Sequence, residues 1–373
     1  MGELQALVVR HLREAGRSRG VRVSMLALGL LLLAVLLGLG GDGHASSTAL
    51  LAGLVGAGVA AVAAAAAGGT VLPADRVEGR EAWLATLAPP TALRRLPAVL
   101  GGSILAVAVG LGACVLLALL LPLVAPDLAV RRAAALAVAP GTRLPRGEPE
   151  EGLLLAVPER SGDALSLAVV FRPLYFGDPS RADVGSPLRV TWSHAGSRGT
   201  ATLAYGRRVV FDLPPGTESV RLASASRAAD LYVTEAHVLG AHAPLFATLL
   251  LAGLLLGGVA GLLSPFAVAL SRFTSGATAV LATLLLALVG ASRSFFLGLA
   301  PTGGGATEDL GLEVVGFVAR LAPDLSVLGA LGDPLAGRAL PVAALAGLLP
   351  LLPWAVVATL AAVLPLPEAE AVA

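Results

Sequence analysis

Histidine, serine and acidic side chains could do chemistry in this chain, but they are few and scattered. His237 and His242 lie close together with Glu235 beside them, as a metal site would require. Two imidazoles so spaced at a strand-to-helix junction more often have other roles. Ser193 and His194 are adjacent, and adjacent strand residues point to opposite faces, which excludes a nucleophile pair. We therefore expect no catalytic residue, no metal site and no cofactor in this chain.

All 26 basic residues are arginine, because the chain contains no lysine. A phosphate-binding loop needs a lysine, so any ATP hydrolysis must come from a separate subunit and this chain is not itself an enzyme. Carboxylates and histidines, the usual mark of ion-coupled transporters, are absent from the apolar segments. The 25 acidic residues leave a net charge of +1. That balance removes any whole-chain argument for binding nucleic acid.

The elements that must position functional residues are apolar helices. Hydrophobic residues make up 56% of the 373 residues and charged residues 14%, against about 25% charged in ordinary soluble domains. A wholly soluble protein is therefore excluded. A membrane-spanning helix needs about 20 apolar residues. Six stretches meet or approach that length, the fifth being the shortest and the last containing two prolines: Val23–Gly41, Thr48–Leu72, Ala98–Ala125, Ala243–Leu270, Gly276–Ala291 and Leu340–Leu364.

The positions of the arginines predict how these spans are oriented. Five arginines precede the first span, and four more lie in the loop 73–97 between the second and third. The positive-inside rule places both regions in the cytoplasm. Counting the spans onward places 126–241 outside and both termini inside. A cleaved signal peptide is the weaker alternative, because its apolar stretch would exceed the usual length of about 7–15 residues.

The composition changes between the third and fourth spans. From Pro126 to about Gly240, short runs of alternating polar and apolar residues are bounded by Gly, Pro, Asp and Ser clusters. This pattern is typical of a small antiparallel β-domain with one core, of the sandwich or jelly-roll type. The expected strands are Leu165–Phe176, Leu188–Ser193, Thr200–Leu213, Ser219–Ala223 and Asp230–Val238.

The loop 73–97 carries the most informative pattern. Residues 78–87 can form a short amphipathic helix with Trp83, Leu84 and Leu87 on one side, ended by a proline pair. A helix at the cytoplasmic ends of two spans can pass force between a membrane bundle and a soluble partner. The alternative is an interfacial helix that only closes the loop.

The order of these elements resembles the permeases of the type-2 ABC exporter family. In that family the loop reads approximately Arg-Glu-x-Gly-Thr and then Leu-Leu-x-Thr-Pro, and forms the coupling helix that docks on the ATPase. Arg80 replaces the usual threonine. Seven residues match the two motifs, the second with about one residue of slip: Arg76, Glu78 and Gly79, then Leu84, Ala85, Thr86 and Pro89. The resemblance implies an ATPase-coupling interface at Asp75, Arg76, Glu78, Gly79, Arg80, Glu81, Trp83, Leu84, Thr86 and Pro89.

A second resemblance lies before the last span. Bacterial members of the superfamily often have a Leu-Pro-Asp-Leu-Ser run there, and this chain reads Pro323-Asp324-Leu325-Ser326 after Ala322. The residues before it form one apolar helical face that includes Val314 and Phe317. They predict an amphipathic segment, 310–325, at the outer membrane surface.

Small residues recur at helical spacing in the fourth span, where Gly253, Gly257 and Gly261 share one face. Lipid provides no hydrophobic drive between helices, so such faces serve close backbone approach. We expect these glycines to pack helices within the chain, with a subunit interface as the alternative.

Together these patterns predict a polytopic α-helical membrane protein of six transmembrane helices with an inserted all-β extracytoplasmic domain. Residues 1–125 hold the first three spans, 126–241 the β-rich domain and 242–373 the last three spans. The resemblance implies an exporter-type permease subunit of the bacterial inner membrane. Its partners would be a cytoplasmic ABC ATPase that binds the ATP, a second permease copy or paralogue, and the lipid bilayer. The alternative is a non-transporting sensor or envelope assembly protein that binds a partner through the β-domain.

Overall fold

The computed structural model describes residues 45–77, 91–124, most of 128–293 and 322–364, with a few single positions elsewhere. The chain forms two compact units. The first consists of 1–128, 245–336 and 340–373, and the second of 129–244 with 337–339. The first unit is helical and the second is built from β-strands.

The helical unit contains long apolar helices and several short ones. Four described segments are long and apolar enough to cross a membrane: Thr48–Ala66, Arg95–Leu123, Leu245–Leu270 and Val342–Val363. The unit's elements are α3 (Ala45–Val77), α5 (Thr91–Val124), α6 (Leu245–Leu270), α7 (Gly276–Ala291), η2 (Ser326–Leu331), α10 (Gly332–Leu335), η3 (Val342–Leu351) and α11 (Leu352–Val363).

Two parts of the six-span prediction differ from the described helices, and a third part is not described. The first predicted span, Val23–Gly41, lies outside the described residues apart from Gly29. The fifth forms α7, whose 16 residues extend about 24 Å at 1.5 Å per residue, short of the roughly 30 Å hydrocarbon core. The predicted loop 73–97 is shorter than expected, because α3 continues to Val77 and α5 begins at Thr91. The segment between these two helices is 78–90.

The last predicted span, which contains two prolines, is not one continuous α-helix. Val342–Leu351 is a 3₁₀ helix that contains Pro350, and an α-helix follows with Pro353 in its first turn. Proline has no N–H to donate, and the N–H groups in the first turn of a helix have no intrahelical acceptor. The change of helix type therefore occurs where the prolines reduce stability least.

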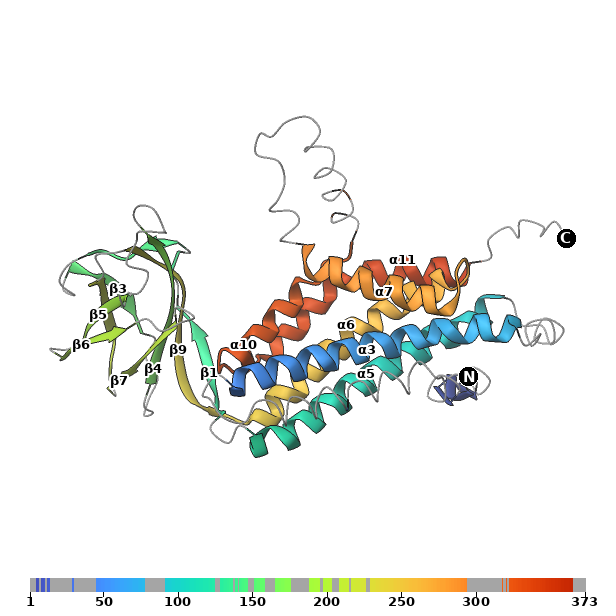
Figure 1. The fold of residues 1–373 in the computed structure, drawn as a ribbon, viewed down its shortest axis with the longest axis horizontal. Coiled ribbons are helices and arrows are strands. Elements are labelled where there is room, and N and C mark those ends of the chain that lie inside the picture. Colours follow the sequence, from blue (N-terminus) through green and yellow to red (C-terminus); the bar gives the residue numbers. More distant parts are fainter. Residues whose placement is uncertain are drawn as a thin grey trace. The chain divides into compact units, whose positions relative to one another are not determined.

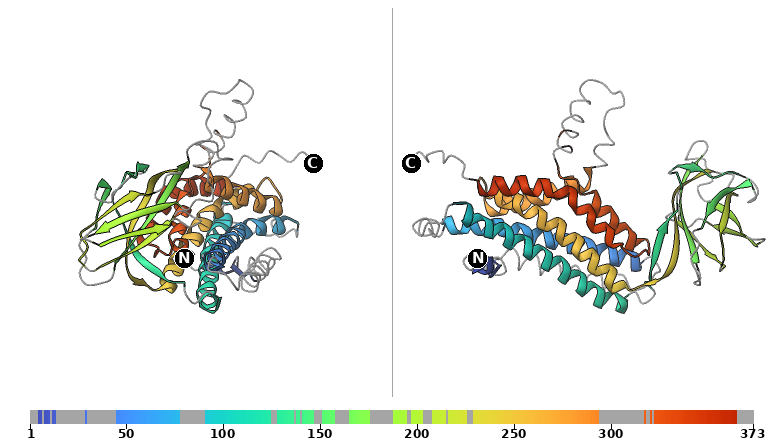
Figure 2. Two further views of the ribbon diagram at one scale, coloured as in Figure 1. Left: turned by 60° about the vertical axis from the view of Figure 1, so that its left-hand side comes forward. Right: turned by 180° about the vertical axis from the view of Figure 1, so that it is seen from behind.

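Three helices run side by side in the first unit: α3, α5 and α6 (Figure 1, Figure 2). Gly53 in α3 faces Leu117 in α5, whereas the Gly102 position, earlier in α5, faces the Ala65 carbonyl. These two helices are therefore antiparallel. The helices α5 and α6 are also antiparallel, because Gly110 faces Gly257 whereas Ser103, earlier in α5, faces Gly261, later in α6.

The helix directions determine which helix ends lie together at each end of the bundle. The last turn of α3, the first turn of α5 and the last turn of α6 lie at one end. The first turn of α3, the last of α5 and the first of α6 lie at the other, and it is there that the chain leaves for the β-rich unit and returns. Residues 78–90 therefore join helices at the end opposite these two connections.

Glycines hold α5 and α6 at backbone contact. A Cβ on Gly257 would lie 2.7 Å from the Val107 Cα, and one on Gly110 would lie 2.9 Å from the Gly257 backbone. A Cβ on Gly253 would lie 3.0 Å from the Cys114 Cβ, and one on Gly261 would lie 3.3 Å from the Ser103 carbonyl oxygen. The three glycines that recur in the fourth span thus lie along α5, within the same chain.

A proline and a serine complete this interface. Pro265 lies inside α6, so it cannot donate to the carbonyl of Gly261 one turn earlier. The Ser103 hydroxyl of α5 donates to that oxygen at 2.8 Å. Next to the proline, the buried Ser264 hydroxyl lies 3.3 Å from the Ala65 and Val99 carbonyl oxygens and shares its proton between them. Side chains therefore satisfy backbone groups that no water reaches.

The second unit consists of two antiparallel sheets. One has the strand order β1-β9-β4-β7 with β2 also paired to β9, and the other has the order β3-β8-β5-β6. Inward-facing residues of both sheets form one apolar core that includes Leu167, Phe171, Val190 and Leu222. The strands are β1 (Val130–Ala135), β2 (Thr142–Arg143), β3 (Leu153–Ala156), β4 (Leu165–Tyr175), β5 (Arg189–His194), β6 (Ser197–Thr202), β7 (Arg208–Leu213), β8 (Ser219–Ser224) and β9 (Ala229–Ala243).

A buried carboxylate holds the short strand β2 on the sheet that contains β9. Asp230 is only 6% exposed and lies 2.8 Å from an Arg143 nitrogen and 3.0 Å from an Arg146 nitrogen. Two guanidinium partners compensate the loss of water around the carboxylate. This cluster is structural, because it fixes the 142–146 segment on β9.

The glycine contact between α5 and α6 predicts a sharp difference between two substitutions in one helix. Gly110→Ala should destabilise the protein by about 1–3 kcal/mol, because the methyl group would overlap backbone that cannot move aside. Gly112→Ala is the control, because nothing lies within 4 Å of that position. It should be neutral or slightly stabilising. Thermal unfolding of the detergent-solubilised chain measures both, and equal midpoints would contradict the interface.

The hydrogen bond from Ser103 predicts a coupled pair of substitutions. Ser103→Ala should cost about 1 kcal/mol, because it leaves the Gly261 carbonyl without a donor. In a Pro265→Ala background the helix regains its own N–H at that position, and Ser103→Ala should then cost much less. The double-mutant cycle is read from thermal midpoints, and additive losses would show that the hydroxyl does not replace the missing N–H.

Candidate functional site

The predicted ATPase-coupling interface is described only at its start. Asp75 and Arg76 lie in the last turn of α3. The other eight residues lie outside the described part of the chain: Glu78, Gly79, Arg80, Glu81, Trp83, Leu84, Thr86 and Pro89. The amphipathic helix expected over 78–87 therefore stays a prediction.

Arginines join several helices at the end of the bundle where 78–90 connects. The Arg272 guanidinium, just after α6, donates to the carbonyl oxygens of Ala361 at 2.6 Å and Leu364 at 3.0 Å. Arg95 in α5 donates to the Ala362 carbonyl at 3.4 Å. These carbonyls end α11 and have no intrahelical donor, and a cation there is also favoured by the helix dipole. The last turn of α11 is thus held by Arg95 of α5 and by Arg272, the second residue after α6.

The second motif contains a turn with a defined cap. The Ser326 N–H donates to Asp324 Oδ1 at 2.9 Å, and Arg293 lies 3.8 Å from the other carboxylate oxygen. The backbone hydrogen bond, more than the arginine, holds the pKa of Asp324 below its usual value. Leu325 is buried against Gly290 at the end of α7. Most of the predicted segment 310–325 lies outside the described residues.

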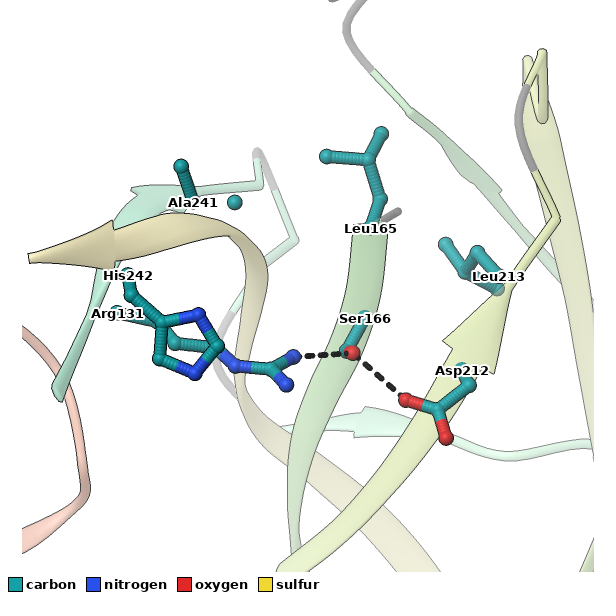
Figure 3. A pocket seen from close by; sticks show the side chains of 8 residues that line it. Arg131, Leu165, Ser166, Asp212, Leu213, Ala241 and His242 are labelled. Carbon is teal, nitrogen blue, oxygen red and sulfur yellow. Dashed lines mark hydrogen bonds between the residues drawn. The ribbon is translucent and has the colours of Figure 1, made fainter. Parts of the chain in front are cut away.

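A polar pocket lies in the β-rich unit, at the end of the sheet where the chain enters and leaves. It has a volume of about 330 Å³. Figure 3 shows the side chains that line it. Its lining residues are Arg131 of β1, Leu165 and Ser166 of β4, Asp212 and Leu213 of β7, and Gly240, Ala241 and His242 of β9.

A row of hydrogen bonds crosses the sheet along this pocket. Arg131 Nη1 donates to Ser166 Oγ at 2.7 Å, and Ser166 Oγ donates to Asp212 Oδ1 at 2.8 Å. Ser166 and Asp212 are register partners on β4 and β7, and Arg131 and His242 are partners on β1 and β9. Arg131 reaches Ser166 across β9, which lies between β1 and β4 in the sheet.

This row is suited to binding rather than to nucleophilic catalysis. The Ser166 hydroxyl is buried, and its single proton is directed to a carboxylate and not to an imidazole. Arg131 supplies a positive charge, and Asp212 supplies a carboxylate that is exposed to solvent. The pocket therefore offers donors on one side and an acceptor on the other.

The histidines that the sequence singled out have other contacts. His237 and Glu235 both contact the Arg338 guanidinium, the carboxylate at 3.1 Å and the nearest imidazole nitrogen at 2.7 Å. The His194 ring nitrogens lie 2.9 Å from the Ser219 carbonyl and 3.0 Å from the Thr217 hydroxyl. Among the described residues no group of three or more His, Cys, Asp or Glu side chains is placed to hold a metal ion.

Arg338 belongs to a three-residue segment that joins the edge of the sheet. The Arg131 N–H donates to the Gly337 carbonyl at 3.0 Å, and the Ala339 N–H donates to the Arg131 carbonyl at 2.8 Å. The segment thus pairs in parallel with β1. It connects α10 to the helix that begins at Val342, so a piece of chain between two helices of the first unit completes the sheet of the second.

Sequence reasoning did not find the pocket. Its polar residues lie on four strands and share no motif, and β1 was not predicted because Val130–Ala135 shows no alternation. One usable signal was Ser166, the polar residue within the apolar stretch Leu165–Phe171.

The comparisons with known proteins add no assignment to this geometry. No protein-family model matches the chain, and no curated protein or solved structure is significantly similar to it.

Proposed function

We propose that this chain is the transmembrane subunit of an ATP-driven ABC transporter, of the exporter type, in a bacterial inner membrane. Six spans, cytoplasmic termini and an extracytoplasmic β-rich unit are part of this proposal. A separate cytoplasmic ATPase would dock on residues 75–90, and a second permease copy or paralogue would complete the pathway. ATP would bind only to the partner ATPase.

The observation that carries the proposal is where the chain leaves the helix bundle. Residues 78–90 connect α3 and α5 at one end, and the connections from α5 to β1 and from β9 to α6 leave from the other. A protein that transmits ATP-driven motion to the far side of a membrane needs this separation. The arginines at the 78–90 end agree with it, because positive charge favours the cytoplasmic side.

The hydrogen bonds at that end supply a route for motion. A displacement of 78–90 would move the first turn of α5, and Arg95 connects that turn to the end of α11. Arg272 connects the end of α6 to the same carbonyls. Docking of an ATPase would therefore act on three helices together, and not on a single loop.

Co-purification tests the proposal. The chain is expressed with the ATPases of its own genome, solubilised in detergent and isolated. One ATPase should remain bound at a fixed ratio. The double substitution Glu78→Ala with Trp83→Ala should remove it, because it takes away the charge and the apolar anchor of the docking helix. Gly112→Ala, in an open position of α5, is the control and should retain the ATPase.

Arg272→Gln separates docking from transmission. This variant should still bind the ATPase, but should lose at least half of the stimulation of ATP hydrolysis that the membrane subunit provides, because α11 is no longer held. Full binding and full stimulation would contradict the proposed route. Failure of every ATPase to bind the wild-type chain would refute the transporter class and favour the alternative, a membrane protein that binds a partner through its β-rich unit.

A further inference from the structure

The pocket in the β-rich unit holds two opposite charges close together. Arg131 and Asp212 are both hydrogen-bonded to the Ser166 hydroxyl, at 2.7 and 2.8 Å. The two charged groups can be no farther apart than the sum of these distances. A guanidinium has five N–H donors and a carboxylate two oxygens, so each retains capacity for a ligand after its bond to Ser166.

This charge pair selects a dipolar ligand. A purely anionic ligand would be repelled by Asp212, and a purely cationic ligand would be repelled by Arg131. A ligand with an anion and a cation a few bonds apart satisfies both groups at once. Leu165 and Leu213 line the same pocket, so the ligand can also have apolar atoms.

The pocket is close in sequence to an apolar span. His242 lines the pocket and is followed three residues later by Leu245, where an apolar span begins. Three residues of extended chain reach at most about 11 Å. Whatever the orientation of the β-rich unit, the His242 end of the pocket therefore lies within reach of the headgroup region of the membrane that α6 enters.

We propose that this pocket binds a phosphoethanolamine group, a phosphate ester that carries a primary ammonium. Arg131 and His242 face the phosphate, Asp212 accepts hydrogen bonds from the ammonium, and the leucines contact the glycerol end. The natural source is the headgroup of a zwitterionic membrane lipid. The inference needs α6 to enter a membrane but does not depend on an ATPase partner, so either proposal can fail without the other.

Calorimetric titration of the purified full chain tests the chemistry. The probes are dihexanoyl lipids with phosphoethanolamine, phosphocholine or phosphoglycerol headgroups. The ethanolamine lipid should bind at least tenfold more tightly than the other two, because phosphocholine has no N–H to donate and phosphoglycerol has no cation. Equal affinity for the phosphoglycerol lipid would overturn the proposal.

Variants locate the binding in the pocket. Arg131→Gln and Asp212→Asn should each weaken ethanolamine-lipid binding at least tenfold. Arg172→Gln, on the same sheet, and Glu151→Gln are the controls, because both residues are exposed and neither lines the pocket. Wild-type affinity in both pocket variants would overturn the proposal. Circular dichroism checks their folding, and Arg131→Lys, which keeps the charge, replaces Arg131→Gln if that variant is unfolded.

Soluble glycerophosphoethanolamine distinguishes the source of the ligand. If it binds tenfold or more weakly than the dihexanoyl lipid, the acyl chains contribute and the ligand is a membrane lipid. If it binds equally well and is displaced by the lipid, the same pocket takes a free phosphoethanolamine compound. Both results support the assigned chemistry, and binding that survives in the Arg131 and Asp212 variants contradicts it.

Discussion

Lipid provides no hydrophobic driving force between helices, and it cannot hydrogen-bond to backbone groups that lack a partner. The packing of the helical unit compensates for both. Glycines let α5 and α6 meet at backbone contact, where dispersion attraction is greatest. Where Pro265 breaks the hydrogen-bond ladder of α6, a hydroxyl from α5 replaces the lost donor. The α5–α6 interface therefore provides both close packing and the missing hydrogen-bond donor. Gly261 contributes to the close packing, and its carbonyl oxygen accepts the replacement hydrogen bond.

This helix pair continues in the β-rich unit as a strand pair. The chain leaves α5 into β1 and returns through β9 to α6, and β1 and β9 are antiparallel neighbours, as the helices are. The pocket lies at the start of that strand pair, with Arg131 on one strand and His242 on the other. Arg131 and His242 are therefore the pocket residues closest in sequence to α5 and α6.

The sequence predicted elements with strong local patterns and missed those that depend on distant partners. Long apolar helices and the strands from Leu165 and Asp230 followed from hydropathy and alternation. The predicted strand Thr200–Leu213 is two strands, β6 and β7, and these belong to different sheets. β1 and the Gly337–Ala339 segment have no pattern of their own and pair only because β9 and β1 are there. For the same reason the Arg131–Ser166–Asp212 row could not be read from spacing.

The three residues that join β1 from far along the chain impose an order on biosynthesis. During translation the strands of the β-rich unit are all made before α6, but one edge of its larger sheet stays open until Gly337–Ala339 has left the ribosome. An open strand edge invites pairing with other chains. The unit therefore cannot be transplanted as one contiguous cassette, and a truncation after α7 would produce strands that are complete in sequence yet unprotected.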